Sequence, residues 1–543
     1  MTDVTGTTTP IDEYLIRQRV LTPVERFAAH IDGHERTTAS RRWRDLVPVS
    51  PPGPGEQYAF EIDLDRCTGC KACVTACHTL NGLDGDESWR RVGTLRGIDP
   101  ATGSGIIQTV THACHHCIDP ACLSGCPVDA YRKDPDTGIV AHLDDQCIGC
   151  LYCTMTCPYE VPAPHRGLGI VRKCDLCAGR LAEGEAPACV QGCPNDAIAV
   201  TVVRVADVVA TLAADARARL LPGAPPSSLT LPTTTYRSER TLPRGARPVD
   251  NGALRPAHGH TPLVVMLVLT QIAVGSATLG WLIELVAPSA VSSTGPLAIL
   301  ALGTAVVALT ASLTHLGRPR YAWRAVRGVS HSWLSREIVA FGLFALFSAL
   351  YAMAVFTGAP RELSVALGGG ATTAGVAGVA ASVMVYAVTG RRSWSVVRTT
   401  ARFALTCLLG GSLSVLTVLS AGGGDPRLIT GAGALGMAAA AAAALTHWQA
   451  RRRRGDRDDP LVLRGSLLRG PLDVPSTARL LLALGVLLLV PAILAVASSS
   501  PGASPGAATL GTVSAATAIC TELLERHLFF RTSGGPRLPT GGA

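Results

Sequence analysis

The sequence predicts an α+β domain followed by an all-α bundle of eight transmembrane helices. Sixteen of the 18 cysteines fall between Cys67 and Cys193, in four short groups. The second half of the chain consists of apolar runs of about 20 residues, the length that crosses a bilayer. The charge divides at the same place, because residues 1–250 carry a net charge of −5 and residues 251–543 a net charge of +13.

Composition divides the chain into five segments. The cysteine-rich part opens with a strand-like alternation at 58–64, and an amphipathic stretch lies around 16–29. The expected segments are an N-terminal arm that docks a partner (1–57), a cysteine-rich domain (58–203), a helix and linker (204–258), a membrane domain (259–531) and a disordered tail (532–543).

The spacing of the cysteines carries the clearest chemical signal. The groups read CTGCKACVTAC, CHHCIDPACLSGCP, CIGCLYCTMTCP, and CDLC followed by CVQGCP. In this pattern three neighbouring thiolates bind one [4Fe–4S] cubane, and the last cysteine, often followed by proline, binds a second cluster. The sixteen thiolates therefore predict four [4Fe–4S] clusters in a double bacterial-ferredoxin-like domain.

Other uses of cysteine fit this spacing poorly. Zinc sites use C-x2-C pairs, in which a third cysteine after two residues has no role. A redox-active C-x-x-C predicts one pair, and a disulfide framework requires an oxidising compartment. The N-terminus shows no apolar secretory segment, and Ser40–Arg44 resembles a twin-arginine signal without the apolar stretch that must follow. We therefore expect this domain to remain in the cytoplasm.

Eight apolar runs are expected to span the membrane. They lie near residues 262–287, 295–315, 334–357, 364–388, 402–422, 428–449, 477–498 and 505–525. Arginines gather in the loops after the second, fourth and sixth runs, whereas the opposite loops contain only Arg361 and Arg427. Because positively charged loops stay inside, both termini and the cysteine domain should face the cytoplasm. Membrane loops explain the positive charge, so we expect no nucleic-acid partner.

Several longer motifs resemble one known family. The segments CHHCIDPACLSGCP, CIGCLYCTMTCPYEVPAPH, KCDLCAGRLAEG and CVQGCPNDAI resemble the four-cluster iron–sulfur subunits of the dimethyl sulfoxide reductase family. The segments PLVVMLVLTQ, SLTHLGRPRYA, SWLSREI and ELLERHLFF resemble the membrane anchor of the same complexes. The resemblance covers residues 58–531 and describes a fusion of two subunits that are usually separate.

The resemblance implies partners and a place in the cell. It implies a molybdopterin-dependent catalytic subunit and the quinone pool, with menaquinol as electron donor. The best-known relatives carry the iron–sulfur subunit on the outer face. The loop charges of this sequence instead place it on the cytoplasmic face of the bacterial inner membrane.

The resemblance also implies which cysteines share a cluster. In each set, the fourth cysteine of one group joins the first three of another. The implied sets are Cys67, Cys70, Cys73 and Cys193; Cys174, Cys177, Cys189 and Cys77; Cys114, Cys117, Cys122 and Cys157; and Cys147, Cys150, Cys153 and Cys126.

Three residues are candidates for a quinone site. His315 ends the second run, and Glu337 begins the third beside Arg336. Ionisable residues at membrane depth are functional candidates, and a His–Glu pair accepts the two protons that quinol releases. In anchors of the resembling family the matching histidine and glutamate are linked to quinol binding. The structural alternative is that His315 caps a helix and Glu337 pairs with Arg336 or a loop arginine.

Three other ionisable residues are expected to be interfacial or structural. Glu284, Glu522 and Arg526 lie near helix ends. Haem b needs axial histidines within the spans. Only His315 and His447 lie at span ends, and both are expected near the cytoplasmic surface. We therefore expect no haem.

Several functions stay open at this point. The sequence shows no phosphate loop, dinucleotide fingerprint or nucleophile elbow, so substrate chemistry should belong to a partner. The favoured function is electron transfer from menaquinol to that partner; a dehydrogenase would use the same module to reduce quinone. A passive anchor fed by a soluble donor is one alternative. An ion-translocating module is another; it requires paired acidic residues at mid-membrane depth, and none is expected to be buried in the spans.

Overall fold

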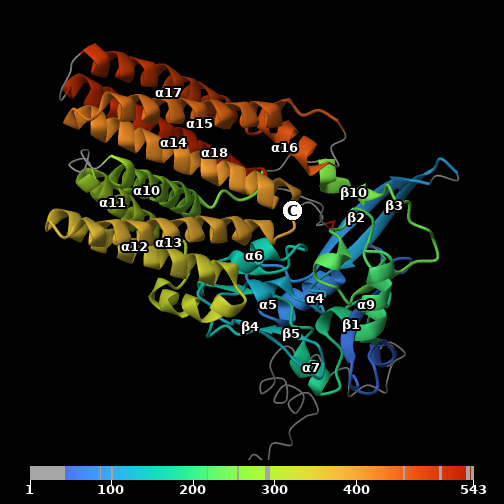
Figure 1. The fold of residues 1–543 in the computed structure, drawn as a ribbon. Helices are drawn as coiled ribbons and strands as arrows, with labels where there is room; N and C mark the ends of the chain where they lie inside the picture. The colour runs from blue at the N-terminus through green and yellow to red at the C-terminus, as the bar shows by residue number, and fades with distance from the viewer. Residues whose placement is uncertain are drawn as a thin grey trace, which may run out of the picture.

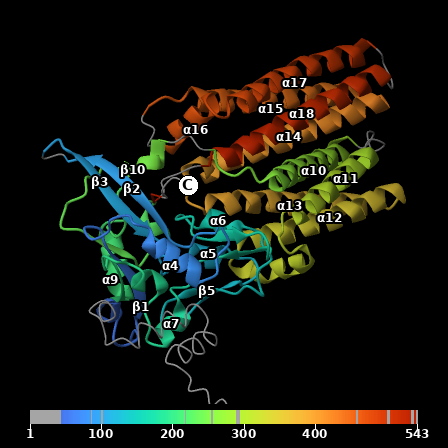
Figure 2. The same ribbon diagram turned by 180° about the vertical axis from the view of Figure 1, so that it is seen from behind.

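A computed structural model describes residues 43–533, with short gaps, together with Leu538 and Pro539. The gaps are residues 86, 100–101, 217, 253–255, 288–293, 456–458 and 500–503. The amphipathic stretch around 16–29 lies outside the described residues. Small sheets and short helices form one part of the molecule, and a bundle of long helices extends from it (Figures 1 and 2). The predicted order of an α+β domain and a helical bundle is confirmed.

The cysteine-rich domain is organised around β1 (Glu56–Asp63). This strand pairs with antiparallel β8 (Ile198–Arg204) on one side and with parallel β9 (Thr235–Arg237) on the other. Tyr58, Phe60 and Ile62 are buried in the domain core, so the strand predicted at 58–64 is confirmed. Because β1 leads into the first cysteine group and β8 follows the fourth, their pairing brings the two ends of the cysteine-rich segment together.

Hairpins and short helices complete this domain. A long hairpin of β2 (Arg91–Ile98) and β3 (Gly105–His112), edged by β10 (Arg247–Pro248), projects from it (Figure 1). The shorter hairpins are β4 (Tyr131–Lys133) with β5 (Val140–His142), and β6 (Ala163–His165) with β7 (Ile170–Arg172). The helices are α4 (Ala72–Leu80), α5 (Ala121–Gly125), α6 (Tyr152–Thr156), α7 (Ala178–Ala182), α8 (Ala188–Gln191) and α9 (Val205–Ala214).

Eight helices in the described part of the chain are long and apolar enough to cross a membrane. They are α10 (Thr261–Val286), α11 (Thr294–Leu313), α12 (Trp333–Phe356), α13 (Arg361–Ala387), α14 (Val396–Gly422), α15 (Pro426–Arg452), α17 (Asp473–Ser499) and α18 (Pro505–Arg531). Between α15 and α17 lies the short helix α16 (Pro460–Arg469). The eight predicted runs are thus found, although α14 begins earlier and α18 ends later than hydropathy indicates.

The long helices form two groups of four. Helices α10 to α13 pack together, and α14, α15, α17 and α18 form the second group (Figure 1). Gly275 of α10 faces the backbone of Cys407, and Gly411 of α14 faces Gly275, with no room for a Cβ atom at either glycine. Glycine allows such a close backbone approach in lipid, where van der Waals packing holds helices together. This contact joins the two groups.

The cysteine-rich domain sits against one end of the bundle (Figures 1 and 2). The chain between α11 and α12 includes a 3-10 segment (Pro319–Ser330) and lies directly on the domain. There, Arg318 N donates to the carbonyl of Ile148 at 3.0 Å, and Ser332 Oγ donates to the carbonyl of Gly125 at 2.8 Å. Backbone atoms of the second and third cysteine groups therefore anchor the domain to the bundle.

The end of the chain differs from expectation. We expected a disordered tail at 532–543, yet Leu538 is buried in the core of the cysteine-rich domain. His112 Nε2 donates to the carbonyl of Pro539 at 3.1 Å, and a Cβ at Gly93 would collide with Pro539. The expectation is wrong for Leu538 and Pro539, because an apolar side chain that reaches a core is removed from water.

Candidate functional site

The four cysteine groups share one local backbone conformation. The residue directly before the second cysteine has a positive φ in each group: Gly69 75°, His116 42°, Gly149 68° and Leu176 61°. A left-handed residue within a turn makes successive N–H groups point into one concave space, which suits an anion. For His116 and Leu176 this conformation is strained, and such strain concentrates at functional sites.

Backbone amides point at several of the sulfur atoms. Gly149 N donates to Cys147 Sγ at 3.4 Å. Ala130 N donates to Cys126 Sγ, and Ala197 N donates to Cys193 Sγ, both at 3.3 Å. These last two bonds come from the same position, four residues after the final cysteine of a group. Such bonds stabilise negative charge on sulfur and are one of the protein's means of setting a cluster potential.

The last cysteine of each group lies beside the cysteines of another group. Burial raises the pKa of Cys77 to about 12, and the Cys189 thiol raises it further. Burial likewise raises the pKa of Cys126 to about 11, with Cys147 as a further contributor. The same electrostatic interaction between thiols links Cys157 with Cys114, Cys117 and Cys122. It also links Cys193 with Cys67 and Cys73. All four sets implied by the resemblance therefore consist of neighbouring thiols.

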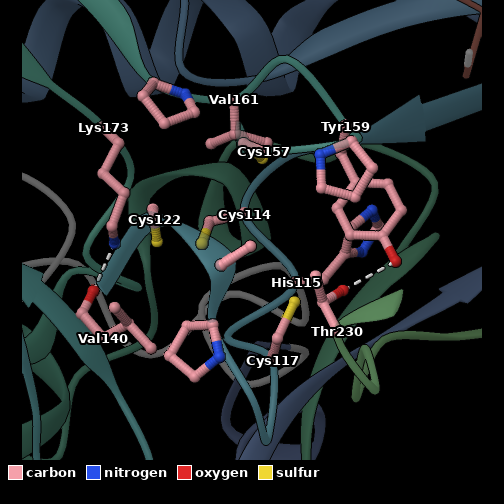
Figure 3. Close-up of a pocket in the computed structure, with 14 residues that line it drawn as sticks. Cys114, His115, Cys117, Cys122, Val140, Cys157, Tyr159, Val161, Lys173 and Thr230 are labelled. Carbon is pink, nitrogen blue, oxygen red and sulfur yellow. Dashed lines mark hydrogen bonds between the residues drawn. The ribbon is translucent and has the colours of Figure 1, made fainter. Parts of the chain in front are cut away.

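One set lines a small cavity. Figure 3 shows Cys114, Cys117, Cys122 and Cys157 around this space, with Lys173 at its edge. Among the described residues, no three Cys, His, Asp or Glu side chains converge on the position of a single metal ion. A cubane differs from a zinc ion in this respect, because each thiolate binds a different iron atom. Four thiols that border a cavity fit such a cluster.

Two fully buried cations lie among the thiols. Lys173 is 3% exposed and donates to the carbonyl oxygens of Val140 and Cys174. Arg90 is 1% exposed and donates to Thr111 Oγ1 at 3.2 Å, whereas its Nε and Nη2 have no hydrogen-bond partner among the described residues. A buried charge without a counterion is costly, so a negative group is required beside them. Cysteine-bound clusters are anionic and fit this requirement.

Comparison with known proteins identifies the relatives of this chain. A family described as 4Fe-4S dicluster domain matches residues 106–203, and a 4Fe-4S binding domain matches residues 58–79. The family described as DMSO reductase anchor subunit (DmsC) matches residues 257–448. The probable anaerobic dimethyl sulfoxide reductase subunit YnfG of Escherichia coli (strain K12) is 43% identical over 148 residues, 26% of this chain and 72% of that protein.

The chain belongs to the dimethyl sulfoxide reductase iron–sulfur subunit family. The B subunit of the anaerobic dimethyl sulfoxide reductase of Haemophilus influenzae is 39% identical over 150 residues, 26% of this chain and 73% of that protein. Hydrogenase-2 operon protein HybA of Escherichia coli O157:H7 is 36% identical over 172 residues, 27% of this chain and 52% of that protein. The chain is thus an iron–sulfur electron-transfer subunit fused to a dimethyl sulfoxide reductase anchor domain, and an integral membrane protein.

Within this fusion of dimethyl sulfoxide reductase subunits, one cysteine set touches the anchor domain. We call Cys126, Cys147, Cys150 and Cys153 the membrane-side set. His315 Nε2 donates to the carbonyl of Cys150, and His331 Nε2 donates to the carbonyl of Cys126, both at 3.0 Å. Burial lowers the pKa of His315, so this imidazole is neutral at pH 7. The anchor therefore holds the backbone of two cysteines in this set.

Two of the three quinone-site candidates, His315 and Glu337, lie near the short helix α6. Ser382 Oγ donates to Glu337 Oε1, and Glu337 is 3% exposed. Arg336 donates to the carbonyls of Val329 and Ser330 at 2.9 and 2.7 Å, so it clamps the preceding loop.

The second group of anchor helices contains a network of buried charges that the sequence analysis missed. Glu522 and Arg526 were expected to be near helix ends, yet they are 3% and 0% exposed inside α18. Arg526 Nη1 lies 3.1 Å from Glu525 Oε2, and Arg479 Nη2 lies 3.9 Å from Glu522 Oε1. The expectation that no paired acidic residues are buried in the spans is therefore wrong. The sequence did contain one signal of this buried network: Arg402 is a charged residue seven residues into the apolar helix α14.

Glu284, also expected to be near a helix end, is buried as well. Tyr351 Oη donates to Glu284 Oε2 at 2.7 Å, and Arg361 donates to the carbonyl of Glu284 at 2.9 Å. Glu284 lies near the C-terminal end of α10, as expected, but faces neighbouring helices. This contact connects α10, α12 and α13 at the end of the bundle away from the cysteines.

Proposed function

We propose that this chain transfers electrons from menaquinol in the membrane to a molybdopterin-dependent catalytic subunit. In this proposal residues 58–203 hold four [4Fe–4S] clusters in the four sets implied above, and each cluster accepts and donates one electron at a time. The observation that carries the proposal is the direct bond between the anchor residue His315 and the carbonyl of Cys150. It joins the cluster-binding loops to the membrane part.

The cysteine sets follow one another across the domain. Tyr131 is buried between the membrane-side set and the set of Cys114, Cys117, Cys122 and Cys157, because both Cys153 and Cys122 raise the pKa of its phenol. Lys173 lies beside Cys114, Cys122 and Cys174. It therefore bridges the set of Cys114, Cys117, Cys122 and Cys157 and the set of Cys174, Cys177, Cys189 and Cys77. Arg90 lies beside Cys73, Cys77, Cys174 and Cys189, and so bridges the set of Cys174, Cys177, Cys189 and Cys77 and the set of Cys67, Cys70, Cys73 and Cys193. This order supports a single electron path.

The far end of the path reaches the surface of the domain. We call Cys67, Cys70, Cys73 and Cys193 the surface set. Cys70 is exposed, and Cys67 and Cys193 are half-buried, whereas most other cysteines of the domain are buried. Electrons have to leave the chain where a partner can approach closely. The surface set therefore supports a catalytic subunit docked here, as the name of the dimethyl sulfoxide reductase relatives suggests.

The quinol end is assigned to the region around α6. Quinol oxidation releases two electrons and two protons, and His315 and Glu337 are the two proton acceptors of the proposed site. Neutral His315 uses Nε2 to hold Cys150 and keeps Nδ1 as an acceptor. Glu337 lies near Tyr152, two residues after Cys150. Arg336 contributes by fixing the loop between α11 and α12.

Orientation and cofactor content belong to the same proposal. The arginines of the loops beside the cysteine-rich domain favour a cytoplasmic position for it. Haem is not part of the proposal, because His315 follows the end of α11 and His447 lies near the C-terminal end of α15, not at mid-bilayer depth. If the partner is a dehydrogenase, the same path delivers electrons to quinone.

Quinol-driven reduction of the clusters in native membranes tests the proposal. Glu337→Gln keeps the shape of the side chain but removes a proton acceptor, and proton transfer of this kind contributes about 10²–10⁴-fold to a rate. We expect cluster reduction by menaquinol to slow by at least about 10²-fold. Dithionite should still reduce the same number of clusters.

A matched control is Arg320→Gln, which changes an exposed arginine of the nearby loop. This variant should keep the wild-type rate. If both variants reduce their clusters with menaquinol at the wild-type rate, Glu337 has no role. If a soluble donor is required instead, the anchor is passive and the proposal fails.

A further inference from the structure

A positively charged groove lies at the cluster-side end of the second helix group. Its lining residues come from α15, α16, α17 and the segment after α15: Trp448, Arg451, Arg452, Arg454, Arg469 and Leu480. The groove has a volume of about 700 Å³, and its lining contains, among the described residues, four arginines and no acidic residue. Ligand pockets of about 300–1,000 Å³ hold small molecules, so the space suffices for a lipid headgroup.

Two of the four arginines are held in place by the protein. Arg469 donates to the carbonyl oxygens of Arg451 and Arg453. Arg451 pairs with Asp473 beside the groove and donates to Thr477 Oγ1 at 2.7 Å. The Arg469 bonds satisfy carbonyls at the C-terminus of α15, where cations are favoured.

The other two arginines keep their donors available. Arg452 stacks on the Trp448 ring at 4.1 Å, and no hydrogen bond or ion pair holds Arg452 or Arg454 within the described part of the chain. Each guanidinium has five donors in a fork that matches the oxygens of a phosphate. The groove therefore presents two unpaired guanidinium groups on a rigid floor.

An apolar surface continues from the groove along the bundle. Leu481, Leu484 and Leu488 recur at helical spacing on α17 and are all more than half exposed. Leu445 on α15 is 52% exposed, one turn before Trp448. Helix α17 lies at the outer edge of the bundle in both views and is the least buried of the eight apolar helices (Figures 1 and 2). This surface faces the acyl chains of the bilayer.

We infer that this groove binds an anionic phospholipid. Arg452 and Arg454 bind its phosphate, Trp448 lies at the headgroup level, and the acyl chains follow the exposed leucines of α17. Basic pockets between membrane helices recognise phospholipid headgroups, and tryptophan favours the interface. Free phosphate matches the arginines but leaves the apolar surface uncovered. A lipid covers both.

The inference is tested on the purified full-length complex in detergent. Phosphatidylglycerol, phosphatidylcholine and inorganic phosphate are added separately, and binding is followed by native mass spectrometry and by the thermal unfolding midpoint. We expect phosphatidylglycerol to bind and to raise the midpoint, and phosphatidylcholine and phosphate to do neither. Higher salt should weaken the binding, because an exposed charge interaction is screened.

Variants locate the site on the protein. The double substitution Arg452→Gln with Arg454→Gln should weaken phosphatidylglycerol binding by at least about ten-fold, as the loss of charge-assisted bonds predicts. The matched control is Arg320→Gln with Arg327→Gln, two exposed arginines on the same side of the membrane. The control should bind as the wild type does. Equal affinity in both double variants, equal effects of the two lipids, or an equal effect of phosphate would overturn the inference.

Discussion

At the scale of residues, the cations among the thiols do more than fill space. Lys173 and Arg90 each lie beside thiols of two different sets. A reduced cluster carries one more negative charge than an oxidised one, so a nearby cation favours the reduced form. Removal of the cation should therefore make the cluster harder to reduce and lower its midpoint potential.

The substitution Lys173→Met tests this effect. We expect the midpoint potential of at least one of the two neighbouring clusters to fall by about 60 mV, which corresponds to about 1.4 kcal/mol for one electron. The measurement is a redox titration monitored by electron paramagnetic resonance, on protein that retains its full iron content. Arg132→Gln, an exposed change on β4, is the control and should leave all potentials unchanged. An unchanged set of potentials in Lys173→Met would show that the lysine serves packing alone.

Two buried histidines predict how stability depends on pH. Burial lowers the pKa of His112 and of His115 to about 3. The unfolded state, with a histidine pKa near 6.5, binds protons first as the pH falls, so each group destabilises the fold below about pH 6.5. The loss is about 1.4 kcal/mol per pH unit for each histidine until the pH approaches 3.

The prediction is measured by thermal unfolding at pH 7 and pH 5.5. His112→Gln can still donate to the carbonyl of Pro539 but does not titrate. Its unfolding midpoint should fall less between the two pH values than that of the wild type. Equal falls in the two proteins would contradict the assignment of His112 as a neutral buried donor.

At the scale of elements, the second helix group is held by polar contacts between helices. Arg526 on α18 donates to Gln271 on α10 at 2.7 Å and to Thr406 on α14 at 3.0 Å. Thr406 in turn donates to Glu522 at 2.5 Å. In lipid, apolar surface alone does not favour one helix arrangement, so such bonds help to fix the packing. The network specifies how α10, α14 and α18 meet.

Arg526→Met tests the importance of this network. The change leaves Glu525 without its closest cation and removes both donors, and breaking a buried ion pair costs about 3–5 kcal/mol. We expect a large fall in the unfolding midpoint of the detergent-purified protein. Arg427→Gln changes an exposed arginine at the start of α15 and should alter stability by no more than about 0.5 kcal/mol. Similar midpoints for both variants would mean that packing alone orders the helices.

The contrast between cysteines and buried glutamates shows what sequence reasoning can reach. Cluster chemistry is encoded in cysteine spacing over a few residues, so the iron–sulfur character and the eight spans followed from local patterns. The burial of Glu522 depends on Arg479 and Thr406, which come from other helices. The role of Arg336 depends on loop carbonyls, and the position of Leu538 on a core formed by residues far earlier in the sequence. Such contacts have no short-range signature.

At the scale of the whole molecule, the fusion places a cluster domain on one end of a membrane bundle (Figures 1 and 2). Three regions of the anchor half hold it there. Loop residues 314–332 bind the second and third cysteine groups, Val385 of α13 accepts a hydrogen bond from Tyr152 at 2.8 Å, and Pro539 reaches β2 and β3. A single polypeptide thus keeps the membrane-side set next to the anchor helices.

The central claim is that sixteen cysteines hold four cubane clusters in this one chain. Iron content of anaerobically purified protein, combined with spin quantification by electron paramagnetic resonance after full reduction, tests it most directly. The account predicts about sixteen irons per chain, four in each of four clusters, and every cluster reducible. A count near eight irons, or zinc in place of iron in the cysteine sets, would contradict it.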